Sequence, residues 1–149
     1  MEKEKWRVVC FVNQFFGQIG GEDMAHVGFT VREDAVGPAQ LFAWLMQKEC
    51  QVVGTVICGD NYFAEHIDQA VQEGVELVRG LDPDLFIAGP AFNAGRYGIS
   101  CGNMASAVAK ALHIPTVTGM YPENPAVEMF RKDTYILKTG ILSSEMRKV

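Results

Sequence analysis

Two kinds of segment alternate along the chain, and each is recognised by the spacing of its hydrophobic residues. Short runs of β-branched and aromatic residues with few polar interruptions are typical of strands buried on both faces. These runs are Trp6–Val12, Gln51–Ile57, Leu85–Ala88, Thr116–Thr118 and Tyr135–Lys138. A looser alternation at Val27, Phe29 and Val31 predicts a short edge strand or arm. We therefore expect a sheet of about five strands.

Between the strands, apolar residues recur at helical spacing. The clearest helix carries its apolar face from Ala64 to Val78. Asp60 or Asn61 is the expected cap at its start. Gly80 is the expected end, because glycine readily adopts the left-handed conformation that stops a helix.

Prolines mark the starts of two shorter helices. Pro38 and Pro125 stand where the first turn of a helix tolerates proline, and Asn124 is placed to cap the second helix. A further apolar face, from Met104 to Leu112, predicts a helix before the fourth strand. Strands that alternate with helices favour right-handed crossovers and a parallel sheet covered on both faces. We expect one three-layer α/β domain over residues 1–149, flavodoxin-like or Rossmann-like, with strand order 2-1-3-4-5.

Composition and charge narrow the class of function. The formal net charge is −5 and no basic cluster is present, which argues against nucleic acid or an acidic membrane as a partner. No apolar stretch reaches the length of a membrane span, and no secretory signal is visible, so we expect a cytoplasmic protein. The four cysteines and three histidines lack metal-ligand spacing and form no CxxC pair, so neither a metal site nor a disulfide framework is predicted.

Polar residues and glycines gather in the loops that follow the first and third strands. In open α/β sheets, ligands bind outside the carboxyl ends of the strands where the strand order reverses, and the expected order places these two loops side by side. The side chains that we predict to line a pocket there are Asn13, Gln14, Glu22, Asn93, Arg96 and Tyr97. The glycines expected to shape these loops and the loop after the second strand are Gly20, Gly21, Gly59, Gly89, Gly95 and Gly98.

Several of these residues have two interpretations. Arg96, just ahead of a predicted helix, suits a small carboxylate, but a surface ion pair is an equal alternative. Cys58 ends the second strand and Cys101 is expected in the first turn of a helix, where the helix dipole lowers the pKa of a thiol. Both are candidate reactive thiols, although cysteines near strand ends more often only pack. Cys10, inside a strand, is expected in the core.

Two further groups of polar residues are weaker candidates. Glu65 and His66 follow Asp60 closely enough to suggest metal binding or acid-base chemistry, but adjacent helical positions point in different directions, which favours a solvated face or a capping role. Glu123 and Asn124 follow the fourth strand and reach toward the same crevice, unless Asn124 only caps the next helix. Neither glycine-rich loop matches a dinucleotide-binding or phosphate-binding pattern.

Four segments together carry a family resemblance. They are VNQFFGQIGGE (12–22), VICGDNYFAEH (56–66), AGPAFNAGRYG (88–98) and IPTVTGMYPENP (114–125). With VGP (36–38) and YILKTG (135–140), they cover nearly the whole chain. The chain resembles the amino-terminal part of the selenoprotein B subunit of glycine, sarcosine and betaine reductases. The pattern Ser143-Ser144-Glu145, a helix start near the last residue, agrees with a fragment of a longer subunit.

The resemblance implies a role in anaerobic amino-acid fermentation. It implies reductive cleavage of a C–N bond in a small amino acid, with acetyl phosphate as the eventual product. The implied partners are the rest of the subunit, pyruvoyl-containing partner subunits that hold the amine, and selenoprotein A. The family's selenocysteine is expected beyond Val149, so this chain alone is expected to be inactive, to carry no cofactor, and to contribute to the substrate pocket and to docking. The alternative is a module that binds a small acid or a flavin without chemistry of its own.

Overall fold

The computed structural model describes residues 5–141 and arranges them as a sheet with helices on its two faces. The strands are β1 (Trp6–Asn13), β2 (Thr30–Arg32), β3 (Cys50–Cys58), β4 (Leu85–Phe92), β5 (Thr116–Met120) and β6 (Tyr135–Lys138). Their order in the sheet is β2-β3-β1-β4-β5-β6. All neighbours are parallel except β2, which pairs antiparallel with β3.

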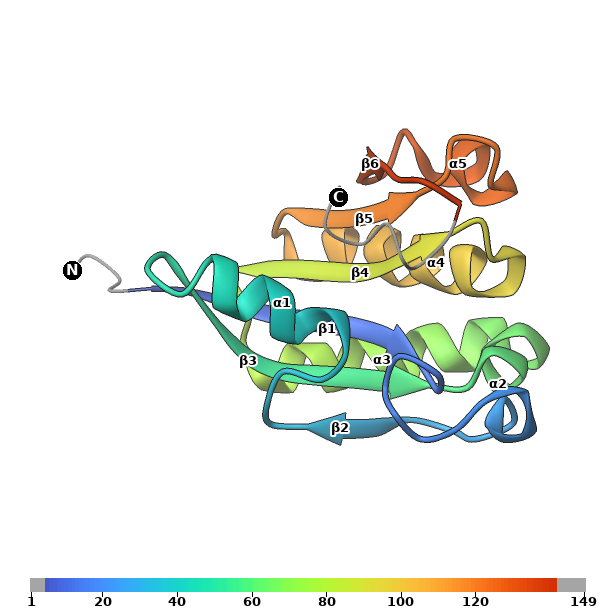
Figure 1. The fold of residues 1–149 in the computed structure, drawn as a ribbon, viewed down its shortest axis with the longest axis horizontal. Coiled ribbons are helices and arrows are strands. Elements are labelled where there is room, and N and C mark those ends of the chain that lie inside the picture. Colours follow the sequence, from blue (N-terminus) through green and yellow to red (C-terminus); the bar gives the residue numbers. More distant parts are fainter. Residues whose placement is uncertain (1–4, 142–149) are drawn as a thin grey trace.

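This topology confirms the α/β class and the order expected for the parallel strands. The segment around Val31, predicted as an edge strand or arm, is the added antiparallel edge strand. The order reverses direction at β1, because β1 lies between β3 and β4. The carboxyl ends of these three strands therefore meet at one end of the sheet (Figure 1).

The helices are unequally divided between the two faces of the sheet. They are the 3-10 helix η1 (Glu22–Met24) and the α-helices α1 (Pro38–Leu45), α2 (Asp60–Glu65), α3 (Ile67–Leu81), α4 (Gly95–Leu112) and α5 (Pro125–Phe130). Figure 1 shows α1 in front of the sheet, with α3 and α4 behind it. None of the described helices is long and apolar enough to cross a membrane. The helix start predicted at Ser143 lies outside the described residues.

The predicted helix over residues 60–80 is in fact two helices. His66 leaves the helical conformation at φ −137° and ψ 46° and separates α2 from α3. The apolar spacing hid this break because both helices bury one face, α2 through Phe63 and α3 through Val75 and Val78. The expected stop at Gly80 is also wrong, since α3 continues to Leu81.

Asp82 supplies the left-handed end of α3 in place of Gly80. It adopts φ 52° and ψ 61°, a conformation that Asp tolerates better than most residues. Arg7 of β1 stabilises this end, because its Nε donates to the Asp82 carbonyl at 2.8 Å and its Nη2 donates to the Leu81 carbonyl at 2.6 Å. The helix therefore ends where a cation from the sheet satisfies its last carbonyl groups.

The main core lies between the sheet and helices α3 and α4. Phe11, Phe86 and Met104 are fully buried there. Helix α5 packs so closely on α4 that a Cβ atom at Gly102 would lie 2.1 Å from the Phe130 ring. A smaller cluster under α1 includes Cys10, which is core as expected. The larger core therefore lies on the face of the sheet that α3 and α4 cover.

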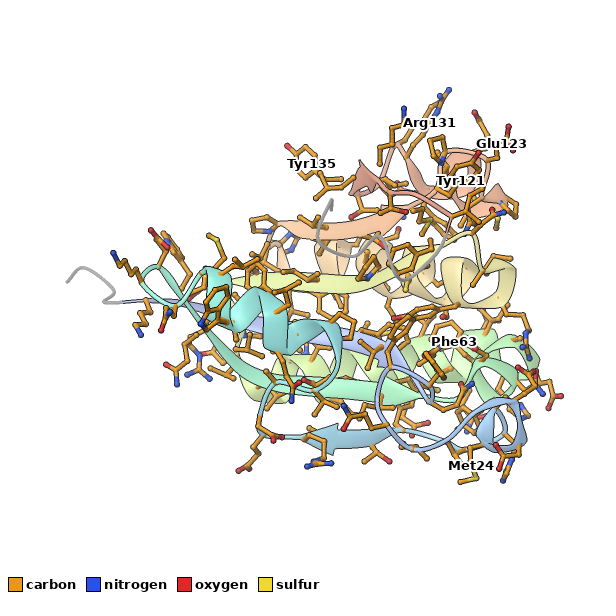
Figure 2. All side chains as sticks on the ribbon, viewed as in Figure 1. Met24, Phe63, Tyr121, Glu123, Arg131 and Tyr135 are labelled. Atoms are coloured by element: carbon orange, nitrogen blue, oxygen red, sulfur yellow. The ribbon has the colours of Figure 1, made fainter. Side chains whose placement is uncertain are left out.

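On the α1 side of the sheet, apolar side chains of β6 are exposed. Ile87 packs in the cluster under α1, and the register pairs Ile87 with Val117 and Val117 with Tyr135. Paired residues of neighbouring strands share a face, so Tyr135 and Leu137 lie on the same face as that cluster. They are 72% and 51% exposed, and Figure 2 shows Tyr135 projecting away from the fold.

The contact between α4 and α5 gives a test of this packing. We expect Gly102→Ala to destabilise the chain by about 1–3 kcal/mol, because the added methyl group overlaps the Phe130 ring. The matched control is Gly80→Ala in α3, where nothing lies within 4 Å of the added Cβ. This control should stabilise the chain by about 0.5–1 kcal/mol, since alanine is the better helix former. Urea unfolding of the two variants measures both effects, and equal effects would contradict the described contact.

Candidate functional site

A cleft opens where the loops after β1, β3 and β4 meet. Its volume is about 370 Å³. The side chains predicted from the sequence all line it: Asn13, Gln14, Glu22, Asn93, Arg96 and Tyr97. Gly21 lines it too, together with residues that the sequence analysis did not single out for the site, above all Asp60 and the aromatic residues Phe15, Phe16 and Phe92. The cleft therefore lies at the carboxyl end of the sheet, where Figure 1 shows these loops.

The floor of this cleft is a network of buried polar side chains. Asn13 Nδ2 donates to Asp60 Oδ2 at 3.0 Å, and Asn13 Oδ1 accepts the backbone N–H of Phe16 at 3.0 Å. Gln14 Oε1 accepts the backbone N–H of Asp60 at 2.9 Å. Asn13, Gln14 and Asp60 are each less than one-tenth exposed. These bonds fasten the loop after β1 to the first turn of α2.

Asp60 does not cap its helix, contrary to expectation. Gly59 occupies the cap position and no side chain caps it, while the Asp60 carboxyl group turns toward Asn13. Burial raises the pKa of Asp60, and the Asn13 amide and the Arg96 guanidinium only partly oppose that effect. Asp60 Oδ1 has no hydrogen-bond partner among the described residues. The position of Asp60 just after β3, the strand expected next to β1, was the signal that could have identified it.

Arg96 forms the ion pair that was the alternative to anion binding. It is in the first turn of α4, and its Nη2 donates to both carboxylate oxygens of Glu22, at 2.5 and 2.8 Å. Its Nη1 donates to Asn61 Oδ1. The guanidinium therefore bridges the loop after β1 and the start of α2 at the mouth of the cleft. A carboxylate ligand at Arg96 would have to displace Glu22.

Tyr97 lies deeper than its polar group suggests. The residue is 1% exposed, and its hydroxyl group has no hydrogen-bond partner among the described residues. Burial raises the pKa of Tyr97 well above its usual value, with smaller contributions from the Cys101 thiol and the Asp60 carboxyl group. Tyr97 and Asp60 both line the cleft, but their unpaired oxygen atoms are buried and not accessible from it.

The cysteines are not activated thiols. Helix α4 begins at Gly95, so Cys101 lies in its second turn instead of the first, and burial raises the pKa of the Cys101 thiol well above its usual value. Burial likewise raises the pKa of Cys58 to about 12, with further contributions from Glu73 and Asp60. At Cys101, desolvation therefore outweighs the lowering of the thiol pKa that was expected from the helix dipole. Neither Cys58 nor Cys101 offers a thiolate at neutral pH.

Three of the six predicted loop glycines, Gly20, Gly59 and Gly98, have a packing role. Strand β4 continues through Gly89 to Phe92, and Gly95 and Gly98 belong to α4, so the predicted ten-residue loop from Gly89 to Gly98 is much shorter. A Cβ atom at Gly98 would lie 2.6 Å from the Asn124 amide. The same holds for Gly59, where a Cβ atom would lie 2.4 Å from the Ala25 carbonyl oxygen, and for Gly20, which packs on Met24.

Asn124 caps α5 and holds a neighbouring loop, but it does not itself line the cleft. Its Oδ1 accepts the N–H of Ala126 at 3.0 Å and so caps α5, as expected. Its Nδ2 donates to the carbonyls of Phe92 and Ala94, each at 3.0 Å, and holds the loop after β4 beside the cleft. Glu123 is exposed and does not line the cleft.

The remaining candidates stay outside the cleft. The His66 ring packs on Tyr62 with centroids 5.2 Å apart, and Glu65 is exposed. Within residues 5–141 there is no group of three or more His, Cys, Asp or Glu side chains that could hold a metal ion.

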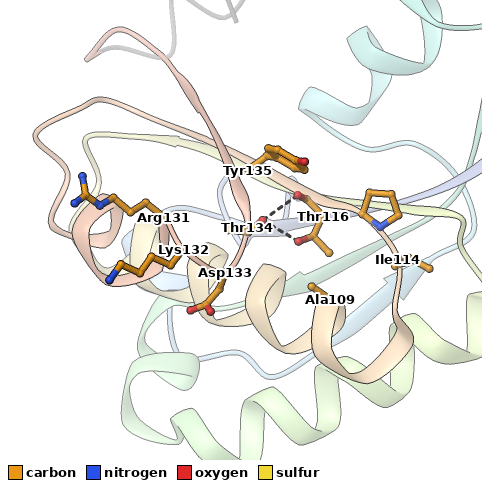
Figure 3. A pocket seen from close by; sticks show the side chains of 9 residues that line it. Ala109, Ile114, Thr116, Arg131, Lys132, Asp133, Thr134 and Tyr135 are labelled. Carbon is orange, nitrogen blue, oxygen red and sulfur yellow. Dashed lines mark hydrogen bonds between the residues drawn. The ribbon is translucent and has the colours of Figure 1, made fainter.

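A second hollow, also of about 370 Å³, lies at the amino end of β5 and contains none of the predicted residues (Figure 3). Its polar groups pair locally, since Thr134 Oγ1 donates to the Thr116 carbonyl at 2.9 Å and Asp133 lies 3.9 Å from Lys110. The charged side chains of Arg131 and Lys132 extend away from Thr116 in Figure 3. We therefore take the cleft lined by Asp60 as the candidate site.

Comparison with known proteins shows the family of the chain. A family model described as glycine/sarcosine/betaine reductase selenoprotein B matches residues 5–149. The chain belongs to this family. It is 52% identical over 96% of its length to the glycine reductase complex component B subunit gamma of Carboxydothermus hydrogenoformans. It is 49% identical over 97% of its length to the sarcosine reductase complex component B subunit beta of Peptoclostridium acidaminophilum.

The chain matches only part of each of these longer relatives. The chain spans about a third of these curated relatives, 33% in both cases. A betaine reductase complex component B subunit beta of Peptoclostridium acidaminophilum is 39% identical over 95% of the chain and is covered to 32%. No solved structure matches the chain.

The buried carboxyl group of Asp60 gives a pH-dependent prediction. A raised folded-state pKa means that folding favours the protonated acid, so the stability from this group is fully present below the pKa of the unfolded chain and is lost as the pH rises through the folded pKa. Asp60→Asn keeps the shape without the charge. We expect this variant to unfold at a higher urea concentration than the parent at neutral pH, with the difference shrinking toward about pH 4. The exposed Glu123→Gln is the control, and a less stable Asp60→Asn at neutral pH would contradict the assigned cause.

Thiol reactivity gives a second test. We expect Cys10, Cys58 and Cys101 to resist an aromatic disulfide reagent in the native chain at neutral pH and to react after unfolding, because burial keeps them protonated and covered. Cys50, which is 8% exposed, should react first. The absorbance of the released thiol counts the reacting groups over time. Rapid native reaction of Cys58 or Cys101, identified by mass spectrometry of peptides, is the contrary result.

Proposed function

We propose that this chain forms part of the substrate-binding region of the B component of a glycine, sarcosine or betaine reductase. The observation that carries the proposal is the cleft at the carboxyl end of the sheet, with a buried polar floor of Asn13, Gln14 and Asp60, in a chain of this family. The reaction class is the reductive cleavage of a C–N bond that leads to acetyl phosphate.

The nucleophile of this reaction does not come from the cysteines of the chain. A selenolate would supply an ionised nucleophile near neutral pH, and a pyruvoyl group on a partner subunit would hold the amine. Cys58 and Cys101 do not fit the first of these roles, because both thiols are buried and their pKa values are raised. In this proposal the chain's own residues bind and orient the substrate, and the reacting groups come from elsewhere in the complex, which includes selenoprotein A.

The exposed face of β6 supports a docking role as well. Tyr135 and Leu137 extend the face that α1 covers elsewhere, and strands of such sheets are normally covered on both faces. The curated relatives are about three times as long as the region matched here. We propose that the remainder of the subunit packs on this face of β6, close to the loops that form the cleft.

Reconstitution of the reductase tests the proposed function. A full-length B component that contains this region is combined with its partner subunits and the second selenoprotein, and acetyl phosphate is measured from glycine, sarcosine and betaine. Asn93→Ala should lower kcat/KM about tenfold or more, since Asn93 lines the cleft and a lost substrate contact of about 1.4 kcal/mol has that effect. Gln72→Ala on the exposed face of α3 is the matched control and should leave turnover unchanged.

Two outcomes would count against the proposal. Equally fast turnover with Asn93→Ala and with the control would show that Asn93, and with it this wall of the cleft, does not contribute to the reaction. Absence of turnover with all three amines would favour the alternative, a module that binds a small acid or a flavin, and the visible absorbance of the purified protein would then separate a flavin from an acid.

A further inference from the structure

The turn that joins β4 to α4 has an uncommon backbone conformation at Phe92. The N–H of Ala94 donates to the Ala91 carbonyl at 3.0 Å and closes a four-residue β-turn. Phe92 is the second residue of this turn, and at φ 52° it is the only one of the four with a positive φ. This sign pattern is that of a type II′ turn, in which glycine normally occupies the position of Phe92. A phenylalanine there is strained and persists only because neighbouring groups hold it.

Two donors from the segment after β5 hold the Phe92 carbonyl. The Tyr121 N–H donates to it at 2.9 Å, and Asn124 Nδ2 donates to it at 3.0 Å. Asn124 Nδ2 also donates to the Ala94 carbonyl at 3.0 Å. The Phe92 ring is buried as well, which restrains the residue from its other side. One buried amide group, that of Asn124, thus bonds the residues before and after Asn93.

The backbone of this turn sets the direction of the Asn93 side chain. Asn93 is exposed and lines the cleft, and within residues 5–141 its side chain makes no hydrogen bond that would orient it. A change of Phe92 to a negative φ would rotate the peptide that follows it and so redirect the Cα–Cβ bond of Asn93. Gly98 leaves room for the clamp, since a Cβ atom there would lie 2.6 Å from the Asn124 amide.

We propose that Asn124 is a positioning residue for Asn93 and acts through the left-handed backbone of Phe92. Asn124 does not line the cleft, so it influences a ligand only through the turn. Its cap of α5 needs Oδ1 alone, whereas the turn is held by Nδ2, so the two roles can be separated by substitution. The inference rests on the proposed function for the ligand that Asn93 contacts, but the clamp on the turn does not depend on it.

Variants at two positions test the clamp without any substrate. Asn124→Ser keeps an oxygen that can cap α5 and removes both donated hydrogen bonds. Gly98→Ala keeps Asn124 and displaces its amide. The NMR readout is the nuclear Overhauser effect between the amide proton and the Hα of Phe92, which is strong at a positive φ because these two protons are then close. We expect this signal to weaken in both variants.

Asn103→Ser is the matched control. Asn103 Nδ2 donates to the Ile99 carbonyl at 3.0 Å within α4, outside the cleft lining, so this variant also loses an amide–carbonyl hydrogen bond. It should leave the Phe92 signal unchanged. Circular dichroism checks that each variant is folded. An unchanged Phe92 signal in a folded Asn124→Ser overturns the inference, and Gly98→Ala decides in the same way if Asn124→Ser does not fold.

Turnover tests whether the clamp acts through Asn93. In the reconstituted reductase, Asn124→Ser should lower kcat/KM about fivefold or more, because a displaced side chain no longer meets the ligand. Asn124→Ser added to Asn93→Ala should cause little further loss, since two residues that act through one contact are not additive. Additive losses would mean that Asn124 acts independently of Asn93, and they would overturn the inference. Asn103→Ser should leave turnover unchanged.

The two proposals fail separately. If Asn93→Ala leaves turnover unchanged, the proposed function falls, while the Phe92 signal still decides whether Asn124 holds the turn. If Asn93→Ala lowers kcat/KM and Asn124→Ser does not, Asn124 is not a positioning residue and the proposed function stands.

Discussion

The hydrogen bond from Asn13 Nδ2 to Asp60 Oδ2 is the interaction on which the candidate site depends. Asn13 is the last residue of β1, and Asp60 begins the helix that follows β3, the neighbouring parallel strand. The bond joins the two strand ends at the point where the order of the sheet reverses. Gln14 repeats the connection through the backbone of Asp60. Together with the carbonyl of Ala25, which accepts the backbone N–H groups of Asn61 and Tyr62, this pair attaches the loop after β1 to α2.

The same interaction requires the Asp60 carboxyl group to be buried, and its desolvation is unfavourable. A buried carboxyl group loses hydration that the Asn13 amide and the nearby Arg96 replace only in part, which is why the pKa of Asp60 is raised. Proteins keep such groups where function needs them, because an apolar or neutral side chain of the same size is usually more stable. The thiols beneath the cleft show the contrary case. Cys58 and Cys101 are enclosed as small apolar side chains, and their environment suppresses ionisation.

Hydrophobic spacing predicted the sheet well and the details of the site less well. Continuous apolar runs identify parallel strands because both faces are buried, and the chain order of strands and helices leaves few topologies. The break at His66 was missed because apolar residues on either side keep the same spacing. The start of α4 was placed too late because Gly95 and Gly98 suggested a loop, whereas Gly98 is small only to admit the Asn124 amide. Asp60 was assigned to a cap because local sequence does not reveal a partner that is 47 residues away.

The two edges of the sheet differ in how they would meet another strand. Strand β2 is three residues long, antiparallel to its neighbour, and ends at the exposed, ion-paired Arg32, so it offers little for further pairing. Strand β6 is the opposite edge, and its exposed Tyr135 and Leu137 are residues that favour strand association. Any growth of the sheet, by another part of the same polypeptide or by a second copy, therefore proceeds at β6. Continued growth there would carry the sheet away from β2 and leave the reversal point at β1 unchanged.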